Sequence, residues 1–324
     1  MKIVILGAGA IGGYYGTLLH RAGHGVAYVA RGETLDLLRE RGLQLTDATG
    51  EAPVTQTIPV RAAASFADAA ALLGGSDLDI DVAVVATKAL PGNDTFGDLS
   101  VGALADVPVV TTHNSVEVHH LAAEHFGADR VLAGVVRTYA ERRGPADIVV
   151  HPGPTGFNFG LMPGASGPRR DRTAAVAEEF AAALRGAGFY SKVHPDIMVD
   201  VWSKAMYVTT TGVLGALSRQ TLAYLRGPLR PQLAGLMEEV AAAGRAHGVN
   251  LPADVVDQTL GFADKMPGGS TSSMHRDIIA GLPNELDAQS GAIRRMAARA
   301  GVPTPLFDMA HGCLEGVLER NPDA

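Results

Sequence analysis

A glycine-rich loop near the start of the chain is the first group of residues that could do chemistry. Gly7-Ala8-Gly9-Ala10-Ile11-Gly12 has the spacing GxGxxG and follows the short apolar run Lys2–Leu6. In this spacing the first glycine makes a tight turn, the second lets the backbone approach a pyrophosphate, and the third lets helix and strand pack closely. The N-terminus of the following helix then offers free N–H groups to phosphates. A flexible turn that binds nothing is the alternative, but the pattern favours a dinucleotide site made by Gly7, Gly9, Ala10, Ile11 and Gly12.

A residue just after the next apolar run is expected to determine whether the protein binds NADP or NAD. The run Val26–Val29 is followed by Ala30 and Arg31, and the nearest carboxylate, Glu33, comes only after Gly32. NAD sites usually have an acidic residue here for the ribose 2′-hydroxyl, whereas a guanidinium fork suits a 2′-phosphate. Arg31 therefore favours NADP, bound as NADPH, over NAD. The alternative is an ordinary solvated arginine.

Two polar side chains follow later apolar runs. Lys88 follows the run Val82–Ala86, and Asn114 follows the run Val107–Thr111. Open parallel sheets bind ligands at the carboxyl ends of their strands. We therefore expect Lys88 and Asn114 to contact the cofactor and the substrate.

The two residues that flank Asn114 have simpler interpretations. His113 has no nucleophile to pair with in the sequence pattern, which favours a structural role. Ser115 is a typical N-cap for the helix expected after it.

The elements that must position these residues follow from the hydrophobic pattern. Short β-branched runs alternate with amphipathic stretches, which indicates βαβ units on a parallel sheet. The expected strands are Lys2–Leu6, Val26–Val29, Val82–Ala86, Val107–Thr111 and Val131–Val136, with helices at Ile11–Ala22, Thr34–Arg41, Phe66–Leu73 and Ser115–Phe126.

A segment rich in glycine and proline, Met162–Arg170, divides the pattern. We expect an α/β fold: a Rossmann-like, doubly wound parallel sheet that binds NADP over residues 1–170, and an all-helical catalytic and substrate domain over residues 171–324. A helix at Thr173–Arg185 and a strand at Phe189–Val193 can still pack on the first domain. Further helices are expected at Val199–Leu217, Pro228–His247, Ala253–Ala263, Asn284–Ala300 and Pro305–Glu319.

The composition excludes other classes of function. The net charge of −7 and the aromatic content of 5% argue against a nucleic-acid surface. No apolar run approaches the ~20 residues that span a bilayer, so no membrane association is expected. The single cysteine, Cys313, cannot form an internal disulfide and fits a reducing, cytoplasmic location.

Over nearly its whole length the chain resembles the ketopantoate reductase (2-dehydropantoate 2-reductase) family. The resemblance rests on several short motifs that occur in the family's order, and none of them would suffice alone. They are Gly7–Gly13, Ala30-Arg31, Thr87-Lys88, Asn114, His151–Gly153, Trp202-Ser203-Lys204, Ser272–Met274, Asp277 and Asn284–Asp287.

The resemblance implies reduction of a 2-oxo acid to a 2-hydroxy acid with NADPH. Lys204 matches the family's general acid, and Glu285 matches the carboxylate that orients the substrate. Ser273 matches a substrate-contacting hydroxyl, and Lys88 and Asn114 would meet these groups across a domain cleft. Without the resemblance to the family, both residues have ordinary interpretations. Lys204 would be a helix lysine with a solvated ammonium group, and Glu285 an acidic residue in the first turn of a helix.

The chain also departs from the family. The positions four and eight residues after Lys204, where the family typically has asparagine, hold Val208 and Gly212. A buried polar substrate group without a partner costs on the order of 1–3 kcal/mol. The departure favours a less polar 2-oxo acid, or an imine reduced by an opine-type dehydrogenase. A non-catalytic NADP-binding redox sensor is a third interpretation, which the presence of Lys204 and Glu285 disfavours. The helical domain is the candidate surface for a homodimer.

Overall fold

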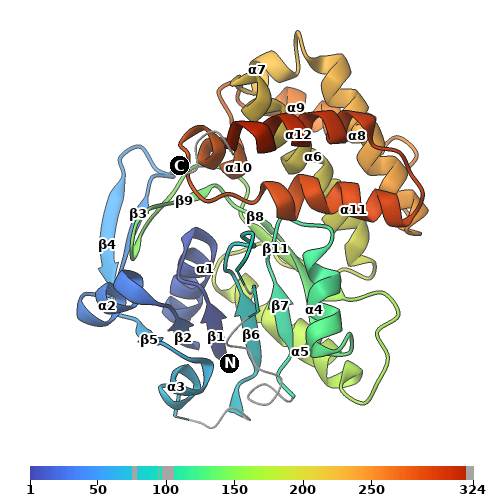
Figure 1. The fold of residues 1–324 in the computed structure, drawn as a ribbon. Coiled ribbons are helices and arrows are strands. Elements are labelled where there is room, and N and C mark those ends of the chain that lie inside the picture. Colours follow the sequence, from blue (N-terminus) through green and yellow to red (C-terminus); the bar gives the residue numbers. More distant parts are fainter. Residues whose placement is uncertain (75–78, 94, 97–105, 319–324) are drawn as a thin grey trace. The chain divides into compact units, whose positions relative to one another are not determined.

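The computed structural model describes residues 1–74, 79–93, 95–96 and 106–318. The chain divides into two units (Figure 1). The first unit comprises Met1–Lys88, Asp94–His113 and His119–Ile197, and the second comprises Ala89–Asn93, Asn114–Val118 and Met198–Ala324.

The first unit is built on a seven-stranded sheet with the order β11-β8-β7-β6-β1-β2-β5. All neighbouring pairs are parallel except β11 with β8. The chain winds from β1 to β2 and β5 on one side and to β6, β7 and β8 on the other, which confirms the expected doubly wound sheet. The strands are β1 (Lys2–Leu6), β2 (Gly25–Val29), β5 (Arg61–Ala63), β6 (Val82–Val85), β7 (Val109–Thr111), β8 (Val131–Arg137) and β11 (Gly156–Leu161).

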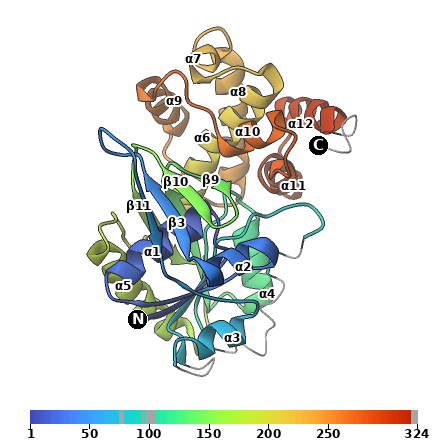
Figure 2. The same cartoon turned by 90° about the vertical axis from the view of Figure 1, so that its left-hand side faces the viewer.

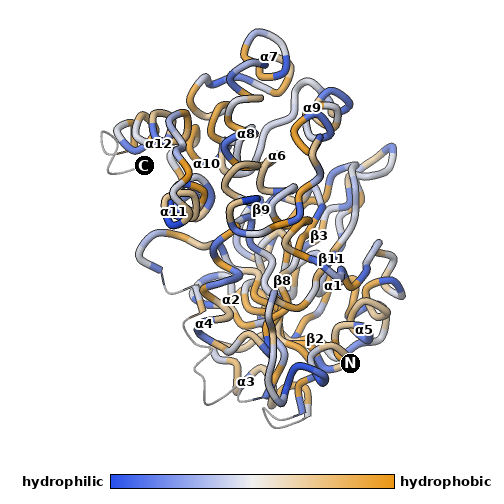
Figure 3. The backbone as a smooth tube through the Cα atoms, turned by 90° about the vertical axis from the view of Figure 1, so that its right-hand side faces the viewer, coloured by the Kyte–Doolittle hydropathy of each residue, from blue (hydrophilic) through white to orange (hydrophobic). Residues whose placement is uncertain are grey.

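Among the described residues of this unit, five helices accompany the sheet, and their apolar faces are buried. The strands form the hydrophobic interior of the unit, coloured orange in Figure 3. The helices are α1 (Ala10–Arg21), α2 (Gly32–Glu40), α3 (Phe66–Ala71), α4 (Val118–Phe126) and α5 (Arg170–Gly186).

A second, four-stranded sheet packs on α1, and the sequence pattern did not predict it (Figure 2). A Cβ atom built on Gly13 of α1 would lie 3.1 Å from the Ile148 side chain and 3.4 Å from that of Leu43. On the larger sheet, Gly16 of α1 faces Ile5 and Tyr28 in the same close way. Glycines therefore let α1 lie tightly between two sheets. The strands of the smaller sheet, in order, are β4 (Val54–Ile58), β3 (Leu43–Asp47), β10 (Asp147–Val150) and β9 (Ala140–Gly144).

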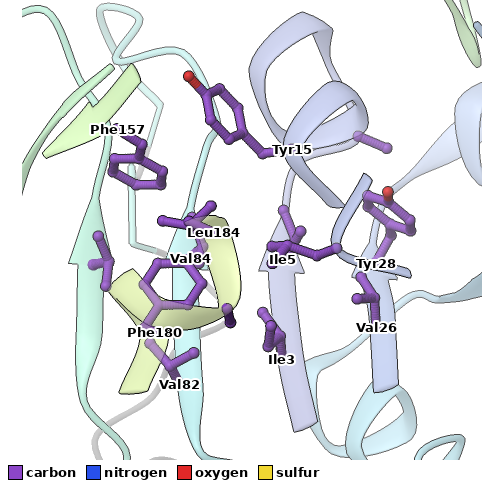
Figure 4. Packing of buried hydrophobic residues seen from close by; sticks show 14 of the residues in the cluster. Ile3, Ile5, Tyr15, Val26, Tyr28, Val82, Val84, Phe157, Phe180 and Leu184 are labelled. Atoms are coloured by element: carbon purple, nitrogen blue, oxygen red, sulfur yellow. The ribbon is translucent and has the colours of Figure 1, made fainter. Parts of the chain in front are cut away.

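Helix α5 belongs to the first unit, so the domain boundary lies after Ile197 and not after residue 170 as the sequence pattern predicted. Its Phe180 and Leu184 are fully buried, and full burial of such a side chain contributes about 1.5–3 kcal/mol. The strand expected at Phe189–Val193 forms only isolated bridges to β11. Figure 4 shows the two α5 side chains in one core with Ile3, Ile5, Val82 and Val84.

The second unit is helical throughout its described residues, as expected. Helix α10 was not predicted. The helix expected at Asn284–Ala300 is a π-helix, η2, followed by α11. Residue Glu319, the expected end of the last helix, lies outside the described residues. The elements are α6 (Ile197–Ser218), α7 (Leu222–Leu225), α8 (Arg230–Ala246), α9 (Val255–Lys265), α10 (Ser273–Ile279), η2 (Asp287–Gly291), α11 (Ala292–Arg299) and α12 (Pro305–Leu318).

In the part of the chain that the structure describes, none of the helices has the length and hydrophobicity needed to cross a membrane.

Candidate active site

The glycine loop lies at the topological switch point of the larger sheet, between β1 and β6. Gly7 has a left-handed φ of +95°, and its N–H donates to the Val29 carbonyl at 2.9 Å. A Cβ atom on Gly7 would lie 3.0 Å from the Ala86 carbonyl and from the Thr87 nitrogen. Glycine is therefore required by both conformation and space. Ligands of open α/β sheets bind at such a switch point.

The other two glycines of the loop have different surroundings. A Cβ atom on Gly12 would overlap the Gly7 carbonyl oxygen and would lie 2.9 Å from the Ile5 side chain and 3.1 Å from that of Ala86, so glycine is required here both by the loop and by the packing of α1 on the sheet. A Cβ atom on Gly9 would have no described atom within 4 Å. Gly9 is the N-cap of α1, and Ala10 and Ile11 begin the helix, so the first-turn N–H groups start there. Packing explains Gly12 but not Gly9.

Arg31 lies where the sequence placed it, just beyond the carboxyl end of β2. It is the exposed N-cap of α2 in extended conformation, with φ −133° and ψ 162°. The preceding strand end is tied to the glycine loop by the Gly7–Val29 hydrogen bond. Arg31 thus stands at the same sheet edge as the loop, one strand away.

Lys88 is exposed in the loop after β6, beyond Ala86 and Thr87, and the residue that follows it makes the link to Glu285. The Ala89 N–H donates to Glu285 Oε1 at 3.2 Å. Glu285 retains only 9% of its exposure, so this buried carboxylate is oriented by the backbone next to Lys88.

Asn114 is half-buried at the start of the segment that follows β7. The Ser115 Oγ accepts hydrogen bonds from the N–H groups of Glu117 at 3.2 Å and Val118 at 3.3 Å. The Ser115 hydroxyl therefore binds N–H groups at the start of α4, but it is not the N-cap, because the helix begins at Val118, three residues later.

Lys204 is half-buried on α6, and Val208 and Gly212 follow it on the same helix face. A Cβ atom on Gly212 would lie 2.7 Å from the Met274 Cε and 2.8 Å from the Ser272 Oγ. An asparagine at position 212 would therefore have to displace the Met274 and Ser272 side chains at the start of α10. Ser273, the first residue of α10, is thereby placed against the helix that carries Lys204.

His113 is fully buried at the end of β7, as its structural interpretation implies. Burial lowers its pKa to about 4, and neither ring nitrogen has a hydrogen-bond partner among the described residues. The imidazole is therefore neutral near pH 7.

The depressed pKa of His113 predicts a loss of stability in mild acid. The unfolded histidine takes up a proton below its ordinary pKa of about 6.5, whereas the folded one stays neutral until about pH 4. The free energy of unfolding should therefore fall by about 1.4 kcal/mol per pH unit in this window, about 3 kcal/mol in all. Urea unfolding of the wild type and His113→Gln between pH 4.5 and 8 measures this. Equal slopes in the two proteins would contradict the assignment.

Sequence analysis did not single out Glu117 or Arg295. The Glu117 carboxylate is buried, and its Oε2 lies 2.7 Å from Arg295 Nη2. A carboxylate within the apolar stretch Val116–Val118 was the available signal, but Arg295 looks like any charged residue on an amphipathic helix.

Comparisons with known proteins cover both units. Residues 3–164 match the family described as ketopantoate reductase PanE/ApbA, and residues 196–318 match its C-terminal counterpart. The 2-dehydropantoate 2-reductase of Mesorhizobium japonicum is 31% identical over 95% of this chain and 95% of its own. The crystal structure of 2-dehydropantoate 2-reductase from Geobacter metallireducens is 25% identical, with a TM-score of 0.83 over 98% of this chain and 100% of its own.

The structure of D-mandelate dehydrogenase with NADH and anilino(oxo)acetate has the same fold. Its TM-score is 0.81 at 21% identity, over 99% of both chains. The matches to both family descriptions and the relative from Mesorhizobium japonicum together show that this chain belongs to the ketopantoate reductase family of oxidoreductases.

Proposed function

We propose that the protein reduces a 2-oxo acid to the 2-hydroxy acid with NADPH. The observation that carries the proposal is the open surface at Gly9, which packing does not require and which lies at the switch point beside Arg31. A pyrophosphate fits this cradle, because Gly9 has no side chain and Ala10 and Ile11 offer first-turn N–H groups. The relatives named 2-dehydropantoate 2-reductase support the substrate class.

In this function, Gly7, Gly9 and Gly12 form the loop that holds the pyrophosphate, and Arg31 binds the 2′-phosphate. When bound, NADPH supplies the hydride. Reduction builds negative charge on the former carbonyl oxygen, which must be neutralised by a proton donor within hydrogen-bond reach. Lys204 is the group that we assign to this step.

The remaining candidate residues orient the substrate. Glu285 is buried and already accepts a hydrogen bond from Ala89, so one carboxylate oxygen is held by the backbone. Ser273 and Asn114 offer a hydroxyl and an amide, and Lys88 offers a cation for the substrate carboxylate or the cofactor.

A less polar 2-oxo acid is the second candidate substrate. Val208 stands where the family has an amide, and Met274 and Ser272 fill the space beside Gly212. The helix face that continues from Lys204 is therefore less polar than in the family pattern. D-mandelate dehydrogenase, solved with anilino(oxo)acetate, shows that an enzyme of this fold is named for a substrate other than ketopantoate.

A substrate panel tests the proposed function. We expect higher kcat/KM for an apolar branched 2-oxo acid, such as 3-methyl-2-oxobutanoate, than for ketopantoate. Val208→Asn should shift the ratio toward ketopantoate about tenfold, because it supplies a partner for the hydroxyl. Ketopantoate as the best substrate of the wild type would refute the less polar pocket. No turnover of any 2-oxo acid would refute the proposed function.

Removal of Arg31 tests the choice of cofactor. Arg31→Ala should raise the KM for NADPH by about 10–100-fold, the loss expected for a charge-assisted pair, and leave the KM for NADH nearly unchanged. Arg41→Ala is the matched control, since Arg41 is an exposed arginine at the opposite end of α2. Equal effects of Arg31→Ala on both cofactors would defeat the assignment.

A further inference from the structure

Two short segments of the chain belong to the second unit, although the strands on either side of them belong to the first. The segment Ala89–Asn93 begins directly after Lys88, and the segment Asn114–Val118 begins with Asn114. The first segment is attached to Glu285 through the Ala89 N–H. The second segment carries Asn114, and a different contact must attach it to the second unit.

That attachment is made by Glu117. Its side chain is only 4% exposed, and a buried carboxylate requires compensating charge. Glu117 Oε2 lies 2.7 Å from Arg295 Nη2, and Glu117 Oε1 lies 2.9 Å from Arg299 Nη2. Two guanidinium groups of α11 therefore hold the segment that carries Asn114.

Arg295 also holds the turn that carries Glu285. Its Nη1 lies 2.6 Å from Asp287 Oδ1, and its Nη2 donates to the Asp287 carbonyl at 3.2 Å. Asp287 follows Glu285 by two positions, and Glu117 follows Asn114 by three. Because a guanidinium is a rigid planar fork, it sets the separation of the two carboxylates that it joins.

The backbone around this pair is shaped to accommodate it. A Cβ atom on Gly291 would lie 2.6 Å from Asp287 Oδ1 and 3.0 Å from Arg295 Nη1. Gly291 closes the π-helix η2, and such single π turns occur frequently at functional sites. The wide turn and the missing side chain leave room for the arginine between the two carboxylates.

We propose that Arg295 is a positioning residue of this enzyme. By joining Glu117 to Asp287, it fixes the segment that carries Asn114 against the turn that carries Glu285. Arg295 itself touches neither the substrate nor the cofactor. The catalytic part of the proposal rests on the proposed function, and the geometric part does not.

The kinetic test compares Arg295→Gln with Arg294→Gln. Arg294 is the neighbouring residue on α11 and forms an ion pair with Asp308 at 2.7 Å that is exposed to solvent, so it controls for the loss of an arginine from α11. Arg295→Gln should lower kcat for the best 2-oxo acid about 10–100-fold, because small displacements of orienting groups are costly. NADPH affinity and every constant of Arg294→Gln should stay within about twofold of the wild type. Arg295→Lys should restore part of the rate.

Hydrogen exchange provides a readout that does not need activity. In Arg295→Gln, the amides of residues 114–118 and of residues 285–291 should both exchange faster than in Arg294→Gln. Faster exchange in one segment alone, or a rate loss that only follows the loss of folded protein, would overturn the proposal. If Arg295→Gln folds poorly, the double variant Glu117→Gln/Arg295→Gln is used in its place. In the double variant the buried carboxylate of Glu117 is also removed, so no buried charge is left without a partner. A wild type inactive on all 2-oxo acids would refute the proposed function, while the exchange result would still decide the positioning role.

Discussion

Replacement of Lys204 by alanine is expected to lower the turnover number about 10²–10⁴-fold, the usual contribution of a general acid. Without the ammonium group on α6, the carbonyl oxygen has to take its proton from water. NADPH affinity should hardly change, because the glycine loop and Arg31 lie in the first unit and Lys204 lies in the second. Stopped-flow measurement of hydride transfer, beside a cofactor titration, separates the two effects.

Two further variants sharpen this test. Lys204→Arg should not restore the rate, because a guanidinium gives up its proton too reluctantly. Lys265→Ala is the charge-matched control, since Lys265 is exposed at the end of α9. A near-normal rate of hydride transfer in Lys204→Ala would remove this residue from the mechanism and leave Lys88 as the next candidate.

Replacement of Gly9 by valine is expected to weaken cofactor binding strongly and leave the fold intact. The new side chain would enter the space where a pyrophosphate must approach, and it meets no described atom of the protein there. Losing two hydrogen bonds to a charged phosphate, at about 1.5–3 kcal/mol each, weakens binding by about 100-fold or more. Calorimetric titration with NADPH measures the affinity, and thermal unfolding measures the stability.

Gly12→Ala gives the contrasting result. Its Cβ would overlap the Gly7 carbonyl oxygen and press on the Ile5 and Ala86 side chains, so it should cost about 1–3 kcal/mol of stability or more, as overpacking does. Normal NADPH affinity in folded Gly9→Val would show that the loop has another role. A large loss of stability in Gly9→Val would show that Gly9, like Gly12, serves packing.

The larger sheet could be predicted from the sequence because its strands are continuous apolar runs, as in Lys2–Leu6 and Val82–Val85. The smaller sheet could not. Its strand Val54–Ile58 is exposed at four of its five positions, and Leu43–Asp47 mixes polar and apolar residues. Such strands are defined by the partners they find, among them α1, and not by their own composition.

Some features of the candidate site could likewise be predicted from the sequence, and others could not. Arg31, Lys88 and Asn114 could be predicted as site residues because a parallel sheet collects the residues after its strands at one edge. The contact between Gly212 and the start of α10 was invisible in the sequence, because it joins residues about 60 positions apart in a packing that no local pattern encodes. The ion pair between Glu117 and Arg295 was hidden for the same reason.

The two segments Ala89–Asn93 and Asn114–Val118, which belong to the second unit, limit how the protein can be cut into separately expressed fragments. Because Ala89 and Glu117 complete the second unit, a fragment that starts at Met198 would lack the donor to Glu285 and the carboxylate that pairs with Arg295 and Arg299. The C-terminal half should therefore not fold to its native form when expressed alone. It should recover only when the N-terminal half is supplied with it, as in a split-protein complementation experiment.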